Sequence, residues 1–359
     1  MRPASQLNRL FTFLFAVLRK VDRMMKLFTV MIAVAVGMTT FAAAAENEVW
    51  MLAYFRQRYE GRVEIDAKGE AHQIPLADPM KVEQLHLAYS DDGRNWTPLN
   101  DNEPIWDQRM RDPFVKRGAD GLWHLLATGG GSRKDRSEGP VCLHAVSQDL
   151  IHWEVAGALP LMKGVRDEND RPARNIWAPE WFQDEASGEY FLLWSSSFED
   201  AGWKKSRIWF SRTKDWKEFT PAKVLFKPSY SVIDGNLMKH EGRYFLFHKE
   251  EEFGPETGER RAIRVAVSDK PEGPYEIRDG ALNGGQLVPT ITEGPSIMPD
   301  PRKSGWLLVY DYCMTNRYGV SSSPDLKSWT IEEEISFPAD ARHGSVFKVG
   351  REEFDRLHE

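Results

Sequence analysis

Three carboxylates occupy similar corners of the chain and could do acid–base chemistry. Asp112 lies in an Arg-Asp-Pro segment, Asp234 in Ile-Asp-Gly and Glu293 in Glu-Gly-Pro, each close to an apolar run. Pro and Gly end the preceding element, so a carboxyl group at such a corner stands at the mouth of a strand. Carboxyl groups crowded at one mouth raise one another's pKa, so that one stays protonated while another is ionised. Such a pair can supply a general acid and a general base.

A simpler interpretation exists for any one of these corners. Asp and Glu before Pro or Gly also form ordinary side-chain-capped turns, which are common in loops. A single corner therefore indicates little. Three corners that open equivalent units of an internal repeat favour convergence on one site.

The repeat is visible in a second signature, a short strand followed by Ser or Thr, a nearby Asp and an aromatic residue. The first copy runs from His86 to Trp96 and the second from His144 to Trp153. The five Ser or Thr markers are separated by 57, 66, 55 and 55 positions, and they are Ser90, Ser147, Thr213, Ser268 and Ser323. Five copies at a nearly constant period indicate a repeat architecture.

Each unit also contains a corner and a hairpin. An apolar strand follows each corner, and X-Gly turns precede these strands at Asp120-Gly121, Ser187-Gly188, Glu241-Gly242 and Ser304-Gly305. Each unit thus supplies about four strands, which is one propeller blade, and helical periodicity is almost absent. Two further corners, around Trp177 to Glu180 and at His343, complete a set of five.

The sequence therefore predicts an all-β, five-bladed β-propeller as one domain over about residues 46–359. The last corner is followed by one short strand, whereas the first repeat copy has the strand Val49 to Tyr54 but no corner before it. We expect these N- and C-terminal strands to share the closing blade, because a closed ring leaves no free sheet edge. Two charged segments, 56–81 and 162–175, are expected to be loops at the substrate rim.

The first 45 residues have the pattern of an export signal. Basic residues precede an apolar run from Leu27 to Val36, which is followed by small residues up to Ala45. Met24 and Met25 lie just before that run, so translation could also start there. A retained membrane anchor is the alternative, although the run is short for a span. We expect a secreted or periplasmic protein without a stable membrane span.

Charge and cysteine content exclude several classes of function. The net charge is −7, and removing residues 1–45 takes away six basic residues and one acid, which leaves −12. A chain this acidic, without a basic stripe, is a poor partner for nucleic acid or anionic membrane. Cys142 and Cys313 are isolated, so the sequence predicts neither a disulfide framework nor a cysteine metal site.

The ordered corners resemble glycoside hydrolase family 43, the arabinofuranosidase and xylosidase group. The match covers nearly the whole predicted mature chain through Arg-Asp-Pro, Trp-Ala-Pro-Glu, Ile-Asp, Glu-Gly-Pro and Arg-His-Gly. The resemblance implies that Asp112 is the general base, that Glu293 is the general acid and that Asp234 tunes and positions the acid. It also implies inversion at the anomeric carbon, with a carbohydrate as the substrate. The chain departs from the common family pattern in one respect. The base motif usually opens the chain, whereas here about 65 residues of the predicted mature chain precede Asp112.

Four more residues are candidates for substrate binding. Arg111 adjoins the expected base, Trp177 could stack on a sugar ring, and Glu180 and His343 could line the channel. Ordinary packing or capping accounts equally well for each of them. No cofactor is expected and no metal ligand is assigned, but the resemblance allows a structural calcium ion in the central channel that reaches His343 through water.

Two alternatives stay open from the sequence alone. A propeller that binds carbohydrate without cleaving it is one, although it has no need of three carboxylates. A hydrolase of related fold acting on fructans, galactans or galactofuranosides is the other, but the nucleophile segment of the fructan enzymes is missing before Asp112. The sequence does not choose the sugar, the linkage, exo or endo action, or the oligomeric state.

Overall fold

The computed structural model describes residues 48–57, 59–65, 67, 71–75, 78–129, 139–198, 205–282, 284–313 and 315–357. The expected export signal lies outside these residues. The chain divides into two units, one of Met1–Glu48 with Gly350–Glu352 and one of Val49–Val349 with Glu353–Glu359. The second unit contains all the strands, apart from Glu48 and Gly350, which are terminal residues of two strands.

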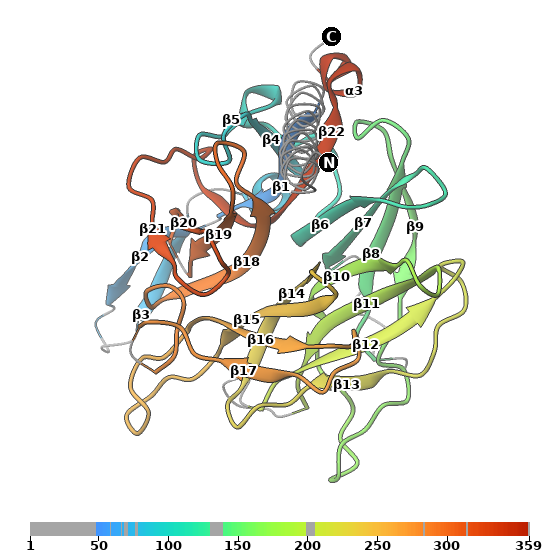
Figure 1. Ribbon diagram of the computed structural model, residues 1–359, viewed down its shortest axis with the longest axis vertical. Coiled ribbons are helices and arrows are strands. Elements are labelled where there is room, and N and C mark those ends of the chain that lie inside the picture. Colours follow the sequence, from blue (N-terminus) through green and yellow to red (C-terminus); the bar gives the residue numbers. More distant parts are fainter. Residues whose placement is uncertain are drawn as a thin grey trace, which may run out of the picture. The chain divides into compact units, whose positions relative to one another are not determined.

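The second unit is a five-bladed β-propeller, as predicted. Each blade is a four-stranded antiparallel sheet in simple up-and-down order. In Figure 1 the first four blades can be followed by colour, from the green strands β6–β9 to the orange strands β18–β21. The first blade is β6 (Arg111–Arg117), β7 (Trp123–Thr128), β8 (Cys142–Ser147) and β9 (Trp153–Leu159). The second is β10 (Trp177–Asp184), β11 (Glu189–Ser196), β12 (Arg207–Thr213) and β13 (Lys223–Phe226). The third is β14 (Val232–His240), β15 (Arg243–Glu250), β16 (Ala262–Ser268) and β17 (Glu276–Arg278). The fourth is β18 (Thr292–Pro299), β19 (Trp306–Tyr312), β20 (Tyr318–Ser323) and β21 (Thr330–Ile331).

The fifth blade joins the two ends of the propeller chain, and this confirms the predicted closure. Its order is β22 (Ala341–Gly350), β1 (Glu48–Arg56), β4 (His86–Ser90) and β5 (Thr97–Pro98). The contact at Gly344 is close enough to exclude a side chain, because an added Cβ would lie 2.0 Å from the carbonyl oxygen of Ala53. The C-terminal strand thus becomes the innermost strand of a blade whose other strands come from the N-terminal part.

Five hydrophobic clusters hold the blades together, and each lies between two neighbouring blades. One example packs Phe191 and Leu193 of the second blade against Val232 and Leu246 of the third. Another packs Leu52 of the closing blade against Leu307 of the fourth. Burial of these side chains is the main favourable term for the ring.

The repeat signature forms the turn between the third and fourth strands. Ser147 Oγ accepts the N–H groups of Asp149 and Leu150 at 3.1 and 2.9 Å. Asp149 Oδ1 accepts the N–H groups of Ile151 and His152, and the Trp153 indole donates to the Leu150 carbonyl at 2.8 Å. Ser, Asp and Trp therefore recur because each closes the same turn.

The corners are β-bulges with left-handed backbone. The ladder between the first and second strands shifts register at Arg111/Phe114, Trp177/Glu180, Ile233/Asn236 and Glu293/Ser296. The first skipped residue has positive φ each time, namely Asp112 (52°), Ala178 (42°), Asp234 (54°) and Gly294 (61°). Pro or Gly follows each one. A bulge re-aims a side chain at the end of a sheet, and non-glycine residues in this conformation concentrate at functional sites.

One of the two expected rim loops contains regular structure. The 56–81 segment includes the hairpin β2 (Tyr59–Ile65) and β3 (Ala71–Pro75) and the start of the helical turn α2 (Pro79–Val82), so the expectation of few strands was wrong. The hairpin leaves the closing blade at the corner end, because the Gln57 N–H donates to the Asp340 carbonyl just before β22. The 162–175 segment is a loop held by an ion pair of 2.6 Å between Arg171 and Asp167.

Candidate active site

The corners of the first, third and fifth blades meet around one histidine. His343 Nδ1, on β22, lies 3.5 Å from Asp112 Oδ1 and 3.9 Å from Asp234 Oδ2. The Gly294 N–H donates to Asp234 Oδ2 at 3.3 Å, which adds the corner of the fourth blade. Asp112 and Asp234, 122 positions apart, and Asp234 and Gly294, 60 positions apart, therefore share one end of the channel.

Glu293 occupies a different position in its corner from the two aspartates. Asp112 and Asp234 are the left-handed bulge residues, whereas Glu293 comes one residue before the equivalent Gly294. The expectation that all three carboxylates are in register was therefore wrong by one residue for Glu293. Gly294 has to be glycine, because an added Cβ would meet the His343 ring at 2.7 Å in a left-handed conformation.

Two cations hold the Glu293 carboxylate. Lys249 Nζ donates to Glu293 Oε2 at 2.8 Å, and the Arg342 guanidinium donates to Glu293 Oε1. Arg342 also donates to Asp311, which is fully buried. The side chains of Lys249 and Arg342 are 1% and 5% exposed, against 13% for Glu293, so these charges interact with little screening by water.

These surroundings separate the protonation equilibria of two carboxyl groups. Burial raises the pKa of Asp234 to about 7, with further contributions from Glu293 and Asp112 that His343 and Lys249 oppose. Burial also disfavours the charged form of Glu293, but Lys249 and Arg342 more than offset it and hold the pKa well below its usual value. The pKa of His343 is raised because Asp234 and Asp112 outweigh the effect of burial. The free site therefore pairs an ionised Glu293 with an Asp234 that titrates near neutral pH.

The remaining predicted residues lie at different depths. Arg111 is at the rim, with its guanidinium 5.0 Å from the centre of the Phe55 ring and 4.0 Å from Glu83. Trp177 begins β10 at the corner and is partly exposed. Glu180 follows the bulge and lies one layer deeper, where Asn236 donates to it at 2.8 Å. Burial raises the pKa of Glu180 well above its usual value.

Lys249 and Asp311 were missed by sequence reasoning, and Arg342 was read only as part of a motif. Lys249 and Asp311 come directly after the apolar segments Tyr244 to His248 and Trp306 to Tyr310. A charged residue that ends a buried strand, at the same place in two repeat units, is the signal that could have identified them. Arg342 stands beside His343 in the fifth corner.

The residues that the structure describes offer little support for a metal centre. Within them, no three His, Cys, Asp or Glu side chains are arranged to hold a metal ion. The same residues include no helix long and apolar enough to cross a membrane.

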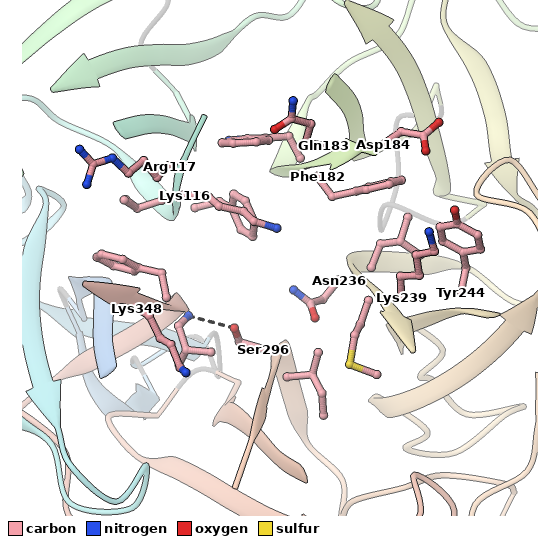
Figure 2. A pocket seen from close by; sticks show the side chains of 18 of the residues that line it. Lys116, Arg117, Phe182, Gln183, Asp184, Asn236, Lys239, Tyr244, Ser296 and Lys348 are labelled. Carbon is pink, nitrogen blue, oxygen red and sulfur yellow. Dashed lines mark hydrogen bonds between the residues drawn. The ribbon is translucent and has the colours of Figure 1, made fainter. Parts of the chain in front are cut away.

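A cavity of about 520 Å³ lies at the other ends of the inner strands. Its lining includes Lys116, Asp184, Lys239 and Lys348, from β6, β10, β14 and β22 (Figure 2). The carboxylates stand at the starts of these strands, so the cavity is at the opposite end of the channel from the acid–base groups. We place the candidate active site at the corners.

Comparisons with known proteins agree with this geometry. Residues 77–355 match a family related to glycoside hydrolase family 43 and described as a probable glycosyl hydrolase domain. No curated protein matches the sequence.

Solved structures of family 43 share the fold at low sequence identity. A thermostable family-43 glycoside hydrolase is 12% identical with a TM-score of 0.53, covering 80% of this chain and 96% of its own. An alpha-L-arabinofuranosidase from Clostridium thermocellum is 13% identical with a TM-score of 0.51, covering 82% and 92%. An arabinoxylan arabinofuranohydrolase from Bacillus subtilis is 16% identical with a TM-score of 0.52, covering 82% and 65%.

The family match spans well over half of the chain, and the propeller holds two aspartates against His343 at one rim. The chain therefore belongs to the glycosyl hydrolases related to glycoside hydrolase family 43.

Proposed function

We propose that this protein hydrolyses O-glycosidic bonds of plant-type polysaccharides or oligosaccharides with inversion of the anomeric configuration. The observation that carries the proposal is the meeting of Asp112, Asp234 and Glu293 at one end of the channel, around His343 and Gly294. Cleavage of a glycosidic bond needs one carboxyl group to protonate the leaving oxygen and a second carboxylate to activate water.

The roles of the three carboxyl groups are those that the resemblance to family 43 implies. Asp112 accepts a proton from a water molecule that attacks the anomeric carbon. Glu293 is ionised in the free site, so it takes up a proton from solvent before the reaction, and that proton passes to the glycosidic oxygen as the bond to the anomeric carbon breaks. Asp234, which is 6% exposed and is coupled electrostatically to Glu293, tunes and positions the acid. At the end of the step Asp112 is protonated and Glu293 is ionised, so a proton exchange with solvent restores the enzyme.

The substrate is proposed to be an arabinofuranoside or a xyloside. Two of the structural relatives are described as arabinofuranosidases. Arg111 and Trp177 lie at the corner rim, where a partly exposed guanidinium and indole can contact a sugar. We assign His343 to the floor of the site, because it is mostly buried between the two aspartates. Glu180 supports the layer below and is not proposed to touch the sugar.

Product stereochemistry tests the mechanism. Chromogenic pentosides and hexosides would first identify a substrate, and proton NMR would then follow the first-formed sugar. We expect an anomer opposite to that of the cleaved bond, because the water attacks from the face opposite the leaving group. Asp112→Asn should abolish turnover while leaving the thermal unfolding midpoint nearly unchanged. A retained anomer, or a sugar trapped covalently on Asp112, would contradict the proposal, and binding without any cleavage would favour a carbohydrate-binding protein.

We also propose that the protein is exported and needs no cofactor. The mature N-terminus should begin at or within a few residues of Glu46, which N-terminal sequencing of the secreted protein would show. Recovery of an intact Met1 or Met25 form in the membrane would contradict export. Turnover should be unchanged by EDTA, whereas a loss restored by calcium would indicate a structural ion in the channel.

A further inference from the structure

The second strand of each of the first four blades ends in a polar residue that points to the next corner. These residues pair with the first-strand positions before each bulge, and they are Thr128, Ser195, Lys249 and Asp311. Because the four residues occupy the same position in each blade, their contacts can be compared directly with one another.

Three of these residues fix the next corner by accepting a backbone hydrogen bond. Thr128 Oγ1 accepts the Ala178 N–H at 2.8 Å, and Ser195 Oγ accepts the Asp234 N–H at 3.0 Å. Asp311 Oδ2 accepts the His343 N–H at 3.0 Å. A hydroxyl group is therefore sufficient to hold a corner in place.

Lys249 differs from the other three because it donates, and its partner is a side chain. Its ammonium group lies 2.8 Å from Glu293 Oε2 and 2.7 Å from Glu251 Oε2, and Cys313 Sγ is 3.7 Å away. Burying an ammonium group at 1% exposure costs far more than burying a hydroxyl. The buried positive charge, rather than the fixing of a corner, distinguishes this position.

We infer that Lys249 is a positioning residue that sets the protonation state of Glu293. The inference rests on the proposed role of Glu293 as the general acid. In the free enzyme Lys249 and Arg342 bind one carboxylate oxygen each and favour the ionised form. Each cation also has a second carboxylate, Glu251 for Lys249 and Asp311 for Arg342. When Glu293 is protonated, each buried cation therefore keeps one carboxylate partner. A buried cation without any partner would be strongly unfavourable.

Lys249 carries its own proton beside the ionised Glu293. Burial disfavours the ammonium form, but Glu293 and Glu251 outweigh it and raise the pKa of Lys249 well above its usual value. Other charged or titratable groups also act on the Lys249–Glu293 pair, from β14, β19, β22 and the segments after β15 and β19. They are Asp234, Asp311, Arg342, His343 and Cys313, with Glu259 farther out. Asp112 of β6 acts on Asp234, and Arg261 acts on Glu251, Glu259 and Cys313.

Substitutions of Lys249 and of its second partner, Glu251, should move the titration of Glu293 in opposite directions. Lys249→Met removes the cation, so the Glu293 midpoint should rise by about 1–3 pH units, the usual effect of losing an opposite charge within hydrogen-bond distance. Glu251→Gln leaves Lys249 with Glu293 alone and removes a nearby negative charge, so the midpoint should fall. Thr128→Val is the matched control, because it removes the acceptor of an equivalent corner without changing charge.

The midpoint can be measured without any substrate. Glutamate labelled with ¹³C at Cδ reports each carboxyl group by NMR, and the Glu293 signal is assigned by its loss in Glu293→Gln. We expect opposite shifts in Lys249→Met and Glu251→Gln and an unchanged midpoint in Thr128→Val. An unchanged midpoint in folded Lys249→Met would overturn the inference. If that variant does not fold, the absence of a downward shift in Glu251→Gln, whose side chain is 14% exposed, would overturn it.

Kinetics then separates this inference from the proposed function. The basic limb of kcat/KM reports an acid that must be protonated in the free enzyme, so it should follow the NMR midpoint in each variant. NMR shifts as expected in a protein that cleaves no glycoside would contradict the proposed function alone. Active variants whose NMR midpoint shifts while the basic limb does not follow it would contradict the role of Glu293 as the acid, and not the effect of Lys249 on Glu293.

Discussion

At the scale of single residues, the site depends on where each carboxyl group stands relative to its bulge. Asp112 and Asp234 occupy the left-handed position itself, and Asp tolerates this conformation better than most residues. Glu293 stands one position earlier and is held by two cations that the aspartates do not contact within hydrogen-bond distance in the described residues. The protein thus gives different protonation equilibria to Asp234 and Glu293, two acids of similar intrinsic strength.

Substitution of the proposed acid should depend on the leaving group. Glu293→Gln should lower turnover by ~10²–10⁴-fold on substrates with poor leaving groups, because these need protonation as the bond breaks. Activated aryl glycosides need little protonation and should lose less. Steady-state rates on matched alkyl and nitrophenyl glycosides measure the difference. Equal losses on both would show that Glu293 is not the acid.

Asp234 should make the folded protein less stable as the pH rises towards neutral. Its pKa is raised from 3.8 to about 7 in the folded state, so between these values the native protein binds more protons than the unfolded chain. Stability therefore falls as the pH rises from about 4 to about 7. His343, with its raised pKa, loses stabilisation with rising pH in the upper part of this range and above it.

Asp234→Asn should flatten this dependence. The amide cannot titrate, and it also removes the negative charge that favours protonated His343. Urea denaturation at pH 4, 5.5, 7 and 8 would compare the slopes of the free energy of unfolding. An unchanged slope in Asp234→Asn would mean that Asp234 does not titrate in this range.

At the scale of elements, a buried ion pair links the fourth and fifth blades. Arg94, in the turn between β4 and β5, donates to both oxygens of Asp300 at 3.1 and 2.9 Å and to Glu332 at 2.8 Å. The side chains of Arg94 and Asp300 are 3% and 0% exposed. This pair joins the turn to the loops after β18 and β21, which the sequence places more than 200 positions away.

Breaking this pair should be costly. Arg94→Met leaves Asp300 as a buried charge, which should lower the free energy of unfolding by ~3–5 kcal/mol. Arg302→Met is a suitable control, because its 2.6 Å pair with Asp92 involves an Arg302 side chain that is 53% exposed and should be worth ~1 kcal/mol or less. Urea denaturation of both variants measures the difference. Similar losses in the two would show that burial does not govern the strength of the pair.

At the scale of the whole propeller unit, closure by β22 and β1 brings His343 and Arg342 to the site. These two residues come from the last strand, whereas Asp112 belongs to the first blade that begins with a corner. Without the paired terminal strands, the ring would have two open edges and the acid–base groups would lose one side of their enclosure.

Gly344 tests this closure. Gly344→Ala should lower both stability and activity, because its Cβ would lie 2.0 Å from the Ala53 carbonyl oxygen and would separate β22 from β1. Gly157→Ala, on the outer strand β9 with open space around it, should change stability by less than ~1 kcal/mol. Thermal unfolding and hydrolysis rates would show the contrast. A Gly344→Ala variant as stable as Gly157→Ala would mean that the closing strands can separate without cost.

The sequence by itself determined the architecture, because the fold repeats local rules. The Ser-x-Asp turns, the hairpin glycines and the Pro or Gly after each corner are short-range signals, and five copies of them predict five blades. The closure was also predictable, since an unpaired strand at each end leaves only one satisfactory arrangement. Asp112, Asp234 and Glu293 were predicted to converge because each lies at a corner of the repeat, and His343 was expected to point into the channel. In the structure His343 Nδ1 lies within 4 Å of a carboxylate oxygen of both aspartates.

The tertiary structure alone decided the charges of the site. The sequence favoured a protonated Glu293 through crowding with other carboxylates, but Lys249 and Arg342 reverse that direction in the free enzyme. Lys249 is 44 positions from Glu293 and Arg342 is 49 positions away, so no local pattern links them. A pKa depends on burial and on charges within a few ångströms, and these are fixed only when the blades pack side by side.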